Sequence, residues 1–496
     1  MTMSAAWNLR QDWYSPDVYS DRMPPFRRLL VERLLGNAAR QSPNRPAVYA
    51  DGEVITFSQL DEMANRTANS LVKAGVRQGD VVALNASNTP ETLAATFGIA
   101  RLGAAILPIN PMNTAREIEF QMEDAHASIL LGTGGLDIAK LIADGDPVTP
   151  EIEVNEQDPY WVRFTSGTTG QPRSFPNSQR NITIQCIYTA AELRYRSDDI
   201  LLINAPLAHA ALIYALSALA VGAAIALEPF NADTVWQDCD RLGVTQVFMV
   251  PTMLSNALEN PGKGDTIRGI LVTASTFPKV IRERVKERFP NADIMEGYGA
   301  SELGMVSVLH RNETDGENGI GRARWGTRVR ILDPEGIECP VGEVGTIYVQ
   351  GPIVSGGFTG KVPAPEYAFR DGWVTAGDMG YVDENGYIYL VDRRHDLIIS
   401  GGLNVYPTEV ENAVMDVEGV REVAVVGAPH EKWGQRVTAV VAGTATAEQI
   451  TEHCRSVLAA YKIPREILIV DELPKSSTGK ILRRLAVDMV AQDKST

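Results

Sequence analysis

The sequence predicts an α/β protein with more than one domain, and three observations support this fold class. The chain has 496 residues, 44% of them hydrophobic and 22% charged, which is a globular composition but too long for one ordinary core. Predicted helices alternate with short apolar strands over residues 30–227, a pattern typical of parallel sheets covered by helices. After about residue 316, short segments of alternating polarity lie between turns with glycine and proline, which predicts a small β-rich part.

The helices and strands of the first half are predicted from the spacing of apolar residues and from residues that can cap a helix. A helix is expected to begin at Thr56–Phe57–Ser58, with Ser58 as its cap, and Leu60 and Leu71 belong to its apolar stripe. The next predicted elements are a strand over 80–84, a helix over 92–102 and a strand over 104–108.

Residues 210–227 form an uncharged stretch that is just long enough to be considered as a membrane span. It is rich in alanine, is interrupted by Ser217 and Gly222, and has no basic cluster beside it. These features favour a buried helix that runs into a buried strand. We therefore expect no integral membrane association.

The second half yields further strands and a domain boundary. Strands are expected over 246–250, 269–273, 329–332, 345–349, 420–427 and 437–442, and helices over 278–288, 407–415 and 447–458. The last hundred or so residues contain their own helices and strands. The boundary is therefore expected near Arg393–His395, which gives domains over 1–393 and 394–496, with a β-rich subdomain over about 317–393.

Charge and cysteine usage restrict the class of protein. The formal net charge of −16 argues against a nucleic-acid-binding surface. The cysteines are far apart and form no CxxC pair, which predicts free thiols in a reducing compartment. The first 24 residues lack the apolar run of a secretory signal, so a cytoplasmic protein is expected. The four cysteines are Cys186, Cys239, Cys339 and Cys454.

Residues 165–173 (Thr-Ser-Gly-Thr-Thr-Gly-Gln-Pro-Arg) carry the most information about chemistry. Hydroxyl side chains and glycines let a backbone bend around an anion and offer it N–H and O–H donors. The spacing is not that of a Walker A loop. From local composition alone, a phosphate-binding loop and a polar surface turn are equally good interpretations.

Five further segments occur downstream in a fixed order: 298–302 (Tyr-Gly-Ala-Ser-Glu), 371–378 (Asp-Gly-Trp-Val-Thr-Ala-Gly-Asp), 392–396 (Asp-Arg-Arg-His-Asp), 400–407 (Ser-Gly-Gly-Leu-Asn-Val-Tyr-Pro) and 474–480 (Pro-Lys-Ser-Ser-Thr-Gly-Lys). Together with the loop, they resemble the adenylate-forming superfamily of acyl-CoA synthetases, aryl-acid ligases, peptide-synthetase adenylation domains and beetle luciferases. The resemblance covers about residues 47–485. It implies a large N-terminal adenylation domain with two mainly parallel, helix-covered sheets and a small β-subdomain, followed by a small mobile C-terminal α/β lid.

The resemblance also implies roles for individual residues. Tyr298 would stack on adenine, Asp378 would accept hydrogen bonds from the ribose, and Glu302 would hold Mg²⁺ on the phosphates of ATP. Lys480, carried by the lid, would neutralise the α-phosphate and orient the carboxylate, with His395 as the hinge. The implied catalytic residues are Lys480, Glu302, Thr165 and His209. The implied nucleotide-binding residues are Thr165, Ser166, Gly167, Thr168, Thr169, Gly170, Arg173, Ser275, Gly297, Tyr298, Ser301, Asp378 and Arg393.

The acyl pocket is expected to begin at His209, whose segment resembles the His-bearing start of the pocket wall in the superfamily. A histidine beside an apolar helix is also common as a core residue, so this interpretation depends on the motif. Ala208 and Ala210 flank His209 where amino-acid-activating domains usually have an aspartate. The other residues expected to line the pocket are Tyr214, Val250, Thr273, Ala274, Gly299, Ala300 and Met305.

Several positions depart from the usual pattern. Arg173 and Ser174 replace Lys-Gly after the phosphate loop, Gln179 replaces the histidine of a His-Arg-Asn motif, and residues 273–275 (Thr-Ala-Ser) replace Gly-Gly-Ala. At the hinge, His395 replaces the usual Lys or Asp, which suggests a pH-sensitive domain rotation. An unchanged pH profile of the thioester step in His395→Lys would contradict that hypothesis.

The predicted function is ATP-dependent activation of a carboxylic acid as acyl-AMP with release of pyrophosphate, followed by transfer of the acyl group to a thiol. Coenzyme A is the first choice of thiol, and the phosphopantetheine of an acyl carrier protein is the second. A neutral aliphatic or aromatic acid is favoured over an amino acid, and a monomer or homodimer is expected. The rival from another class is a nucleotide-binding relative without turnover. A Rossmann oxidoreductase, suggested by the lone glycine cluster 132–135, is disfavoured.

Overall fold

The computed structural model describes residues 29–164, 172–275, 277–313, 319–357, 359–362, 366–393, 396–400, 403–430, 433–475 and 481–493. Some predicted site residues lie outside the described residues, as does the side chain of Arg393. These residues are Thr165, Ser166, Gly167, Thr168, Thr169, Gly170, His395 and Lys480.

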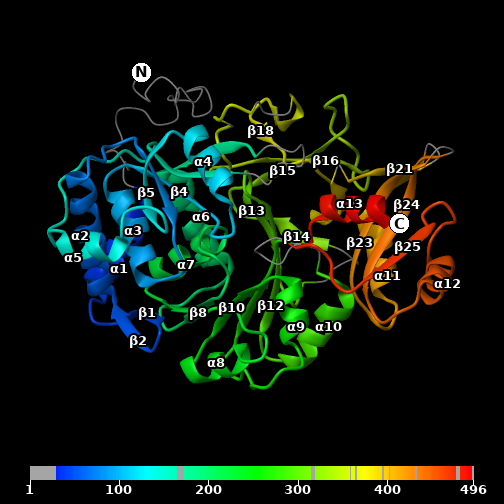
Figure 1. Cartoon of the computed structure of the whole chain (residues 1–496), viewed down its shortest axis with the longest axis horizontal. Helices are drawn as coiled ribbons and strands as arrows, with labels where there is room; N and C mark the ends of the chain where they lie inside the picture. Colours follow the sequence, from blue (N-terminus) through cyan, green and yellow to red (C-terminus); the bar gives the residue numbers. More distant parts are fainter. Residues whose placement is uncertain are drawn as a thin grey trace.

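A five-stranded sheet forms one end of the molecule, with α2, α3 and α5 beside it (Figure 1). Its strand order is β5-β3-β4-β6-β7; the first four strands are parallel and β7 runs antiparallel to β6. The strands are β3 (Val81–Asn85), β4 (Ala105–Pro108), β5 (Ala127–Gly132), β6 (Pro159–Phe164) and β7 (Ser174–Ser178). The associated helices are α2 (Phe57–Lys73), α3 (Pro90–Arg101), α4 (Ala115–Asp124) and α5 (Ile138–Asp144).

A second, 15-stranded sheet runs through the middle of the molecule. Its parallel part has the order β12-β11-β10-β8-β9-β1, and β2 closes this edge in antiparallel orientation. These strands are β1 (Pro46–Ala50), β2 (Glu53–Thr56), β8 (Ile200–Ile203), β9 (Ala224–Leu227), β10 (Gln246–Met249), β11 (Gly269–Val272) and β12 (Asp293–Ala300). The helices of this region are α1 (Val31–Gln41), α6 (Gln179–Glu192), α7 (Ala211–Ala220), α8 (Val235–Leu242), α9 (Pro251–Ala257) and α10 (Lys279–Arg288).

The predicted β-rich part is a continuation of this sheet, because β13 pairs with both β12 and β14, and β14 pairs with β20. The sequence did not predict this continuity, since strand pairing between distant segments has no local signature. The elements are β13 (Gly304–Leu309), β14 (Gly319–Ala323), β15 (Arg328–Leu332), β16 (Gly345–Gln350), η4 (Glu366–Ala368), β17 (Phe369–Arg370), β18 (Trp373–Val374), β19 (Asp378–Val382) and β20 (Tyr387–Arg393).

The C-terminal region has its own sheet, at the opposite end from β3–β5 (Figure 1). Strand β20 of the large sheet ends at Arg393, and the C-terminal sheet begins at Ile398. The division into domains 1–393 and 394–496 stays a prediction. The elements are β21 (Ile398–Ser400), β22 (Leu403–Val405), α11 (Pro407–Met415), β23 (Val420–His430), β24 (Gly434–Gly443), α12 (Ala447–Val457), β25 (Glu466–Val470) and α13 (Arg483–Asp493).

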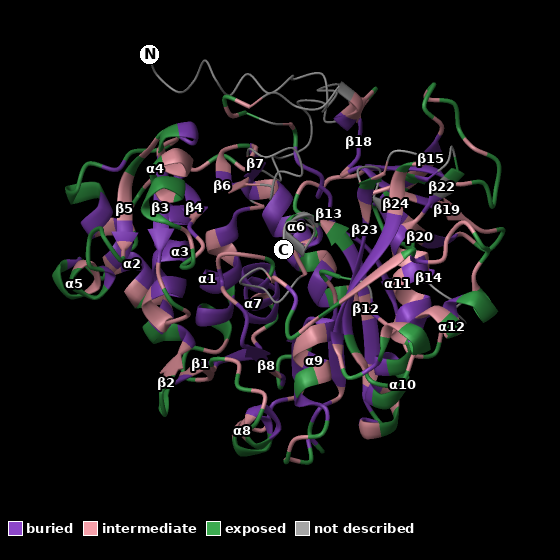
Figure 2. Ribbon diagram, turned by 45° about the vertical axis from the view of Figure 1, so that its right-hand side comes forward, coloured by how far each residue is buried: buried purple, intermediate pink, exposed green. Residues whose placement is uncertain are grey.

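One continuous apolar core joins the first two sheets. It contains side chains from α1, α2, α3, α6 and α7 together with strands of both sheets, among them Phe97, Trp161 and Leu216. Figure 2 shows the strands and α7 as largely buried, whereas the outer helix α5 has exposed surface. Helices α6 and α7 therefore stand between the sheets and support the strand ends beside them.

Two expectations about helices have clear outcomes. The uncharged stretch is helix α7 followed by strand β9, as predicted, and no helix in the described ranges is long and apolar enough to span a membrane. The predicted cap of α2 is wrong: Thr56, not Ser58, accepts from Gln59 N at 3.3 Å, and Thr56 N donates back to Gln59 Oε1 at 2.8 Å. This reciprocal pairing requires a Gln three residues after the cap, which only Thr56 has. All four cysteines are free, as predicted.

Candidate active site

The predicted pocket residues gather where three parallel strands of the large sheet end. Val250 follows β10, Thr273 follows β11, and Gly299 lies near the end of β12. Thr273 Oγ1 donates to the carbonyl oxygen of Gly297 at 2.6 Å, and a methyl group added at Gly297 would face Leu271, Thr273 and Met305. Ligands in α/β proteins bind at this carboxyl edge of the strands, so the arrangement is that of a binding site.

Tyr298 and Asp378, the predicted adenine and ribose residues, are brought together. The Tyr298 hydroxyl donates to Asp378 Oδ2 at 2.9 Å, although the two residues are 80 positions apart in the sequence. Tyr298 lies in β12 and Asp378 begins β19, and both are buried. The pairing of β13, β14 and β20 is what carries β19 to this place.

Glu302 lies in the short turn between β12 and β13, and two hydrogen bonds to carbonyl oxygens of this turn hold it in place. The Glu302 carbonyl oxygen accepts from Ser355 N at 2.8 Å, and the Ser301 carbonyl oxygen accepts from Arg163 Nη1 at 3.1 Å. The described residues contain no group of three or more His, Cys, Asp or Glu side chains that could hold a metal ion by themselves. A single carboxylate fits Mg²⁺ that is held mainly by phosphate oxygens and water.

His209 follows β8 in the loop that leads to α7. Its Nε2 is buried and has no hydrogen-bond partner within the described ranges, and burial lowers the pKa of His209. The imidazole is therefore neutral at pH 7. Asn88 holds this loop: its Nδ2 donates to the Ala205 carbonyl oxygen at 2.8 Å, and its Oδ1 accepts from Leu207 N at 2.9 Å.

Sequence reasoning missed Asn88 as a support of the His209 loop. It precedes Thr89, whose side chain caps α3, so its local signature is only that of a helix start. The partner loop lies more than a hundred residues downstream, and nothing in the sequence links the two.

Tyr214 and Met305, two of the predicted acyl-pocket residues, both belong to the large apolar core that joins the first two sheets, as do Phe248 and Leu271. The rings of Tyr214 and Phe248 lie 4.6 Å apart. Burial raises the pKa of Tyr214, so its phenol stays protonated. Ala274, beside Thr273, has a φ of +78°, in the region where the superfamily pattern has glycine.

The predicted phosphate loop lies outside the described residues, but the strands on both sides of it are described. Phe164 of β6 pairs with Ser174 of β7, which brings the two ends of the loop together. Ser174, one of the departures from the usual pattern, donates from its hydroxyl to Asp124 Oδ2 at 2.7 Å. Asp124 Oδ1 also accepts from Lys361 N at 2.7 Å, so a buried carboxylate of α4 fixes the exit of the loop.

Arg483 connects the end of the large sheet to the C-terminal region. Its guanidinium contacts Asp392 Oδ1 at 3.4 Å and Asp396 Oδ2 at 2.8 Å, and it also pairs with Glu411. The carboxylate of Asp392 accepts from Thr408 N at 2.8 Å through its other oxygen. Asp392 and Asp396 flank the predicted hinge His395 in the sequence, and His395 itself lies outside the described residues.

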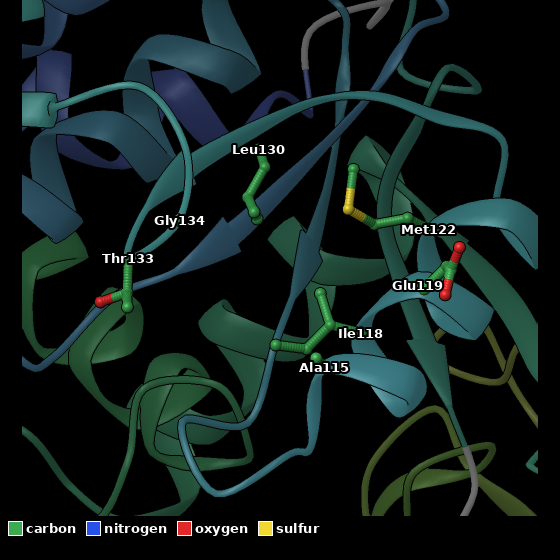
Figure 3. Close-up of a pocket in the computed structure, with 7 residues that line it drawn as sticks. All are labelled: Ala115, Ile118, Glu119, Met122, Leu130, Thr133 and Gly134. Carbon is green, nitrogen blue, oxygen red and sulfur yellow. The ribbon is translucent and has the colours of Figure 1, made fainter.

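An open, apolar hollow of about 410 Å³ lies away from these residues (Figure 3). Ile118, Met122 and Glu119 of α4 form one wall, and Leu130, Thr133 and Gly134 at the end of β5 form the other. None of the predicted site residues lines it.

Comparison with known proteins places the chain in a family. Residues 35–359 match the AMP-binding enzyme family, and residues 409–480 match the AMP-binding enzyme C-terminal domain. A feruloyl-CoA synthase of Amycolatopsis sp. is 34% identical over 474 residues, which cover 90% of this chain and 96% of that protein. A 2-succinylbenzoate–CoA ligase of Oceanobacillus iheyensis is 30% identical, with 90% and 97% covered.

Solved structures agree with these matches. ATP-bound MatB from Rhodopseudomonas palustris aligns with a TM-score of 0.86 at 26% identity and covers 92% of this chain and 98% of its own. The o-succinylbenzoate CoA synthetase MenE from Bacillus subtilis, in complex with its acyl-adenylate intermediate, aligns with a TM-score of 0.84 at 28% identity, with 92% and 97% covered. The predicted fold class is confirmed, and the chain belongs to the AMP-binding enzyme family.

Proposed function

We propose that the protein uses ATP to activate a carboxylic acid as its acyl adenylate and then transfers the acyl group to coenzyme A. It is an AMP-forming acid–thiol ligase. The observation that carries the proposal is the hydrogen bond between Tyr298 and Asp378, next to Gly299, which pairs with the predicted acyl-pocket residue Met305 of β13. This proximity of predicted nucleoside residues to a predicted acyl-pocket residue supports the proposal, because formation of a mixed anhydride of acid and AMP requires the two ligands to meet.

In the first half-reaction, the acid's carboxylate attacks the α-phosphorus of ATP and pyrophosphate leaves. Tyr298, Asp378 and Arg393 hold the nucleoside, and residues 165–170 with Arg173 bind the phosphates. Glu302 would hold Mg²⁺, which offsets the charge of the phosphates when bound. Lys480 supplies a fixed cation between two anions that must meet, which lowers the barrier.

In the second half-reaction, the C-terminal region turns about His395 and a thiol attacks the acyl carbon, releasing AMP. Coenzyme A is the proposed thiol because the relatives reported above are named as CoA synthases and ligases. A neutral His209 suits this step, because it would add no charge beside the adenylate. The phosphopantetheine of a carrier protein is the alternative acceptor.

The test is pyrophosphate release from MgATP across a panel of aliphatic and aromatic acids, with and without coenzyme A. Lys480→Ala should slow release by about 10²- to 10³-fold, whereas Lys73→Ala, an exposed position of α2, should not. Acceleration by coenzyme A identifies the acceptor. Release that only a carrier protein accelerates would replace coenzyme A by that acceptor, and no release with any acid would contradict catalysis.

A further inference from the structure

The turn that carries Glu302 is anchored to both strands beside the phosphate loop. On the entrance side, Arg163 of β6 donates from Nη1 to the Ser301 carbonyl oxygen at 3.1 Å. On the exit side, Ser355 N donates to the Glu302 carbonyl oxygen at 2.8 Å, and the Ser355 hydroxyl donates to the carbonyl oxygen of Pro176 in β7 at 3.1 Å. Strands β6 and β7 lead into and out of the phosphate loop, so hydrogen bonds connect this turn to both ends of the loop.

The turn itself leaves the backbone of Glu302 little freedom. Only residues 301–303 separate β12 from β13, and Leu303 N donates to the Ala300 carbonyl oxygen at 3.1 Å. Leu303 is fully buried in the apolar core. Gly304 begins β13 with a φ of +69°, a conformation that glycine adopts without strain. The backbone position of Glu302 is therefore set from both sides.

Arg163 is an unusual residue for a largely buried strand, and its contacts explain how it is kept there. Its neighbours Trp161 and Val162 are buried. The guanidinium carbon lies 4.0 Å from the centre of the Trp161 ring, so the face of the indole accommodates the cation. Burial lowers the pKa of Arg163 to about 10, and Cys186 and Glu302 act in the opposite direction. The guanidinium is therefore charged at pH 7, within electrostatic reach of the Glu302 carboxylate.

We propose that Arg163 and Ser355 are positioning residues that hold the carboxylate of Glu302 in a fixed place relative to the phosphate loop. The inference rests on the proposed function, in which Glu302 holds Mg²⁺ and the loop binds the phosphates of ATP. Mg²⁺ demands near-ideal octahedral geometry, so a carboxylate that shares the ion with phosphate oxygens must keep its place relative to the loop. Groups that orient a metal-binding side chain contribute about 10- to 100-fold to metal affinity or activity. Neither positioning residue needs to touch the nucleotide.

The test measures how binding of a non-hydrolysable ATP analogue depends on free Mg²⁺, by calorimetry, together with the KM values for ATP and acid in pyrophosphate release. Arg163→Met should raise the Mg²⁺ concentration for half-maximal binding by about 10- to 100-fold and raise the KM for ATP, while the KM for the acid stays unchanged. Arg163→Lys should recover part of the loss, because an ammonium can still donate to the Ser301 carbonyl oxygen. Ser355→Ala loses the bond to Pro176 but keeps its N–H on Glu302, so it should give a smaller shift in the same direction. If Arg163→Met does not fold, an unshifted Mg²⁺ dependence in both of the other variants overturns the inference.

Arg324→Met and Ser307→Ala are the matched controls, because each removes a donor to a backbone carbonyl oxygen that is not in the Glu302 turn. Arg324 Nη1 donates to the Met305 carbonyl oxygen at 3.2 Å. Ser307 Oγ donates to the Ile320 carbonyl oxygen at 2.6 Å. Both variants should lower the free energy of unfolding without changing the Mg²⁺ dependence. No shift in Arg163→Met, or an equal shift in Arg324→Met, overturns the inference and leaves the ligase intact. A shift confined to Arg163→Met, with no pyrophosphate release from any acid, would support the positioning role and contradict the ligase alone.

Discussion

Ala274 occupies a backbone conformation that its side chain disfavours. Its φ is +78°, and a Cβ atom in the left-handed region costs about 1 kcal/mol relative to glycine. We therefore expect Ala274→Gly to raise the free energy of unfolding by about 0.5–1 kcal/mol in denaturant titrations. Ala191→Gly, at an exposed position of helix α6, should instead lower it by about 1 kcal/mol. Destabilisation by both substitutions would contradict the assignment of strain at Ala274.

Arg163 shows how much of a site a sequence reveals at the scale of single residues. Glu302 and Asp378 were predicted because each stands inside a motif. Arg163 lies just before the phosphate loop, in a strand that is otherwise largely buried. A cation in an apolar strand is unusual, and this was the one feature of the sequence that could have marked Arg163 as a functional residue. Its partner, the Ser301 carbonyl oxygen, lies 138 residues downstream, so its support of the turn that carries Glu302 could not be inferred before the fold was known.

Helix α4 is joined to the exit of the phosphate loop through one carboxylate. Asp124 accepts from the Ser174 hydroxyl and from Lys361 N, and its removal leaves one buried and one partly buried donor unpaired. Asp124→Ala should lower the free energy of unfolding by about 2–4 kcal/mol and raise the KM for ATP. Denaturant titration and pyrophosphate release measure the two effects. The control Asp144→Ala, at the exposed end of α5, should change neither the unfolding free energy nor the KM for ATP. A normal KM for ATP in Asp124→Ala would show that Asp124 stabilises the fold without positioning the phosphate loop.

The ends of β13 and α6 meet in a histidine–carboxylate cluster that makes stability depend on pH. His310 Nδ1 lies 2.7 Å from Asp293 Oδ2, and Nε2 lies 3.5 Å from Glu192 Oε1. Hydrogen bonds to Asp293 and then Glu192 raise the pKa of His310 to about 9. The folded pKa exceeds the unfolded value of about 6.5, so this stabilisation is complete below pH 6.5 and is lost as pH rises through about 9.

The corresponding experiment compares the wild type with His310→Gln by denaturant titration from pH 6 to 9.5. The difference in unfolding free energy should shrink by about 1–3 kcal/mol over this range. Exposed His126, whose φ of 54° asparagine tolerates, supplies the control His126→Asn. A difference that stays constant with pH would show that His310 contributes by packing alone.

At the scale of the whole molecule, the sequence predicted the layers better than their connections. The apolar stretch 210–227 could be predicted as a buried helix followed by a buried strand, because it is apolar on every side but too interrupted for a membrane span. Helix α7 and strand β9 confirm this prediction. The union of the β-rich part with the central sheet was not recognisable, because backbone pairing between β12, β13, β14 and β20 leaves no trace in side-chain periodicity. The same limitation concealed the pair of Tyr298 and Asp378, although each residue was identified separately.

Arg483 links the C-terminal region to the end of the large sheet. Asp392 at the end of β20, Asp396 and Glu411 share its guanidinium, so Arg483→Met leaves three partly buried carboxylates close together without their cation. Removing one partner of such a cluster costs about 3–5 kcal/mol.

We expect Arg483→Met to unfold the C-terminal region at a lower denaturant concentration than the rest of the protein, and to allow protease cleavage between residues 393 and 397. Arg483→Lys should lose less stability, because the ammonium group keeps the positive charge although it lacks the planar, bidentate geometry of the guanidinium. Arg455→Met, exposed in α12, is the control. A single transition at the wild-type midpoint in Arg483→Met would mean that apolar packing of α13 against β23, rather than this ion cluster, attaches the end of the chain.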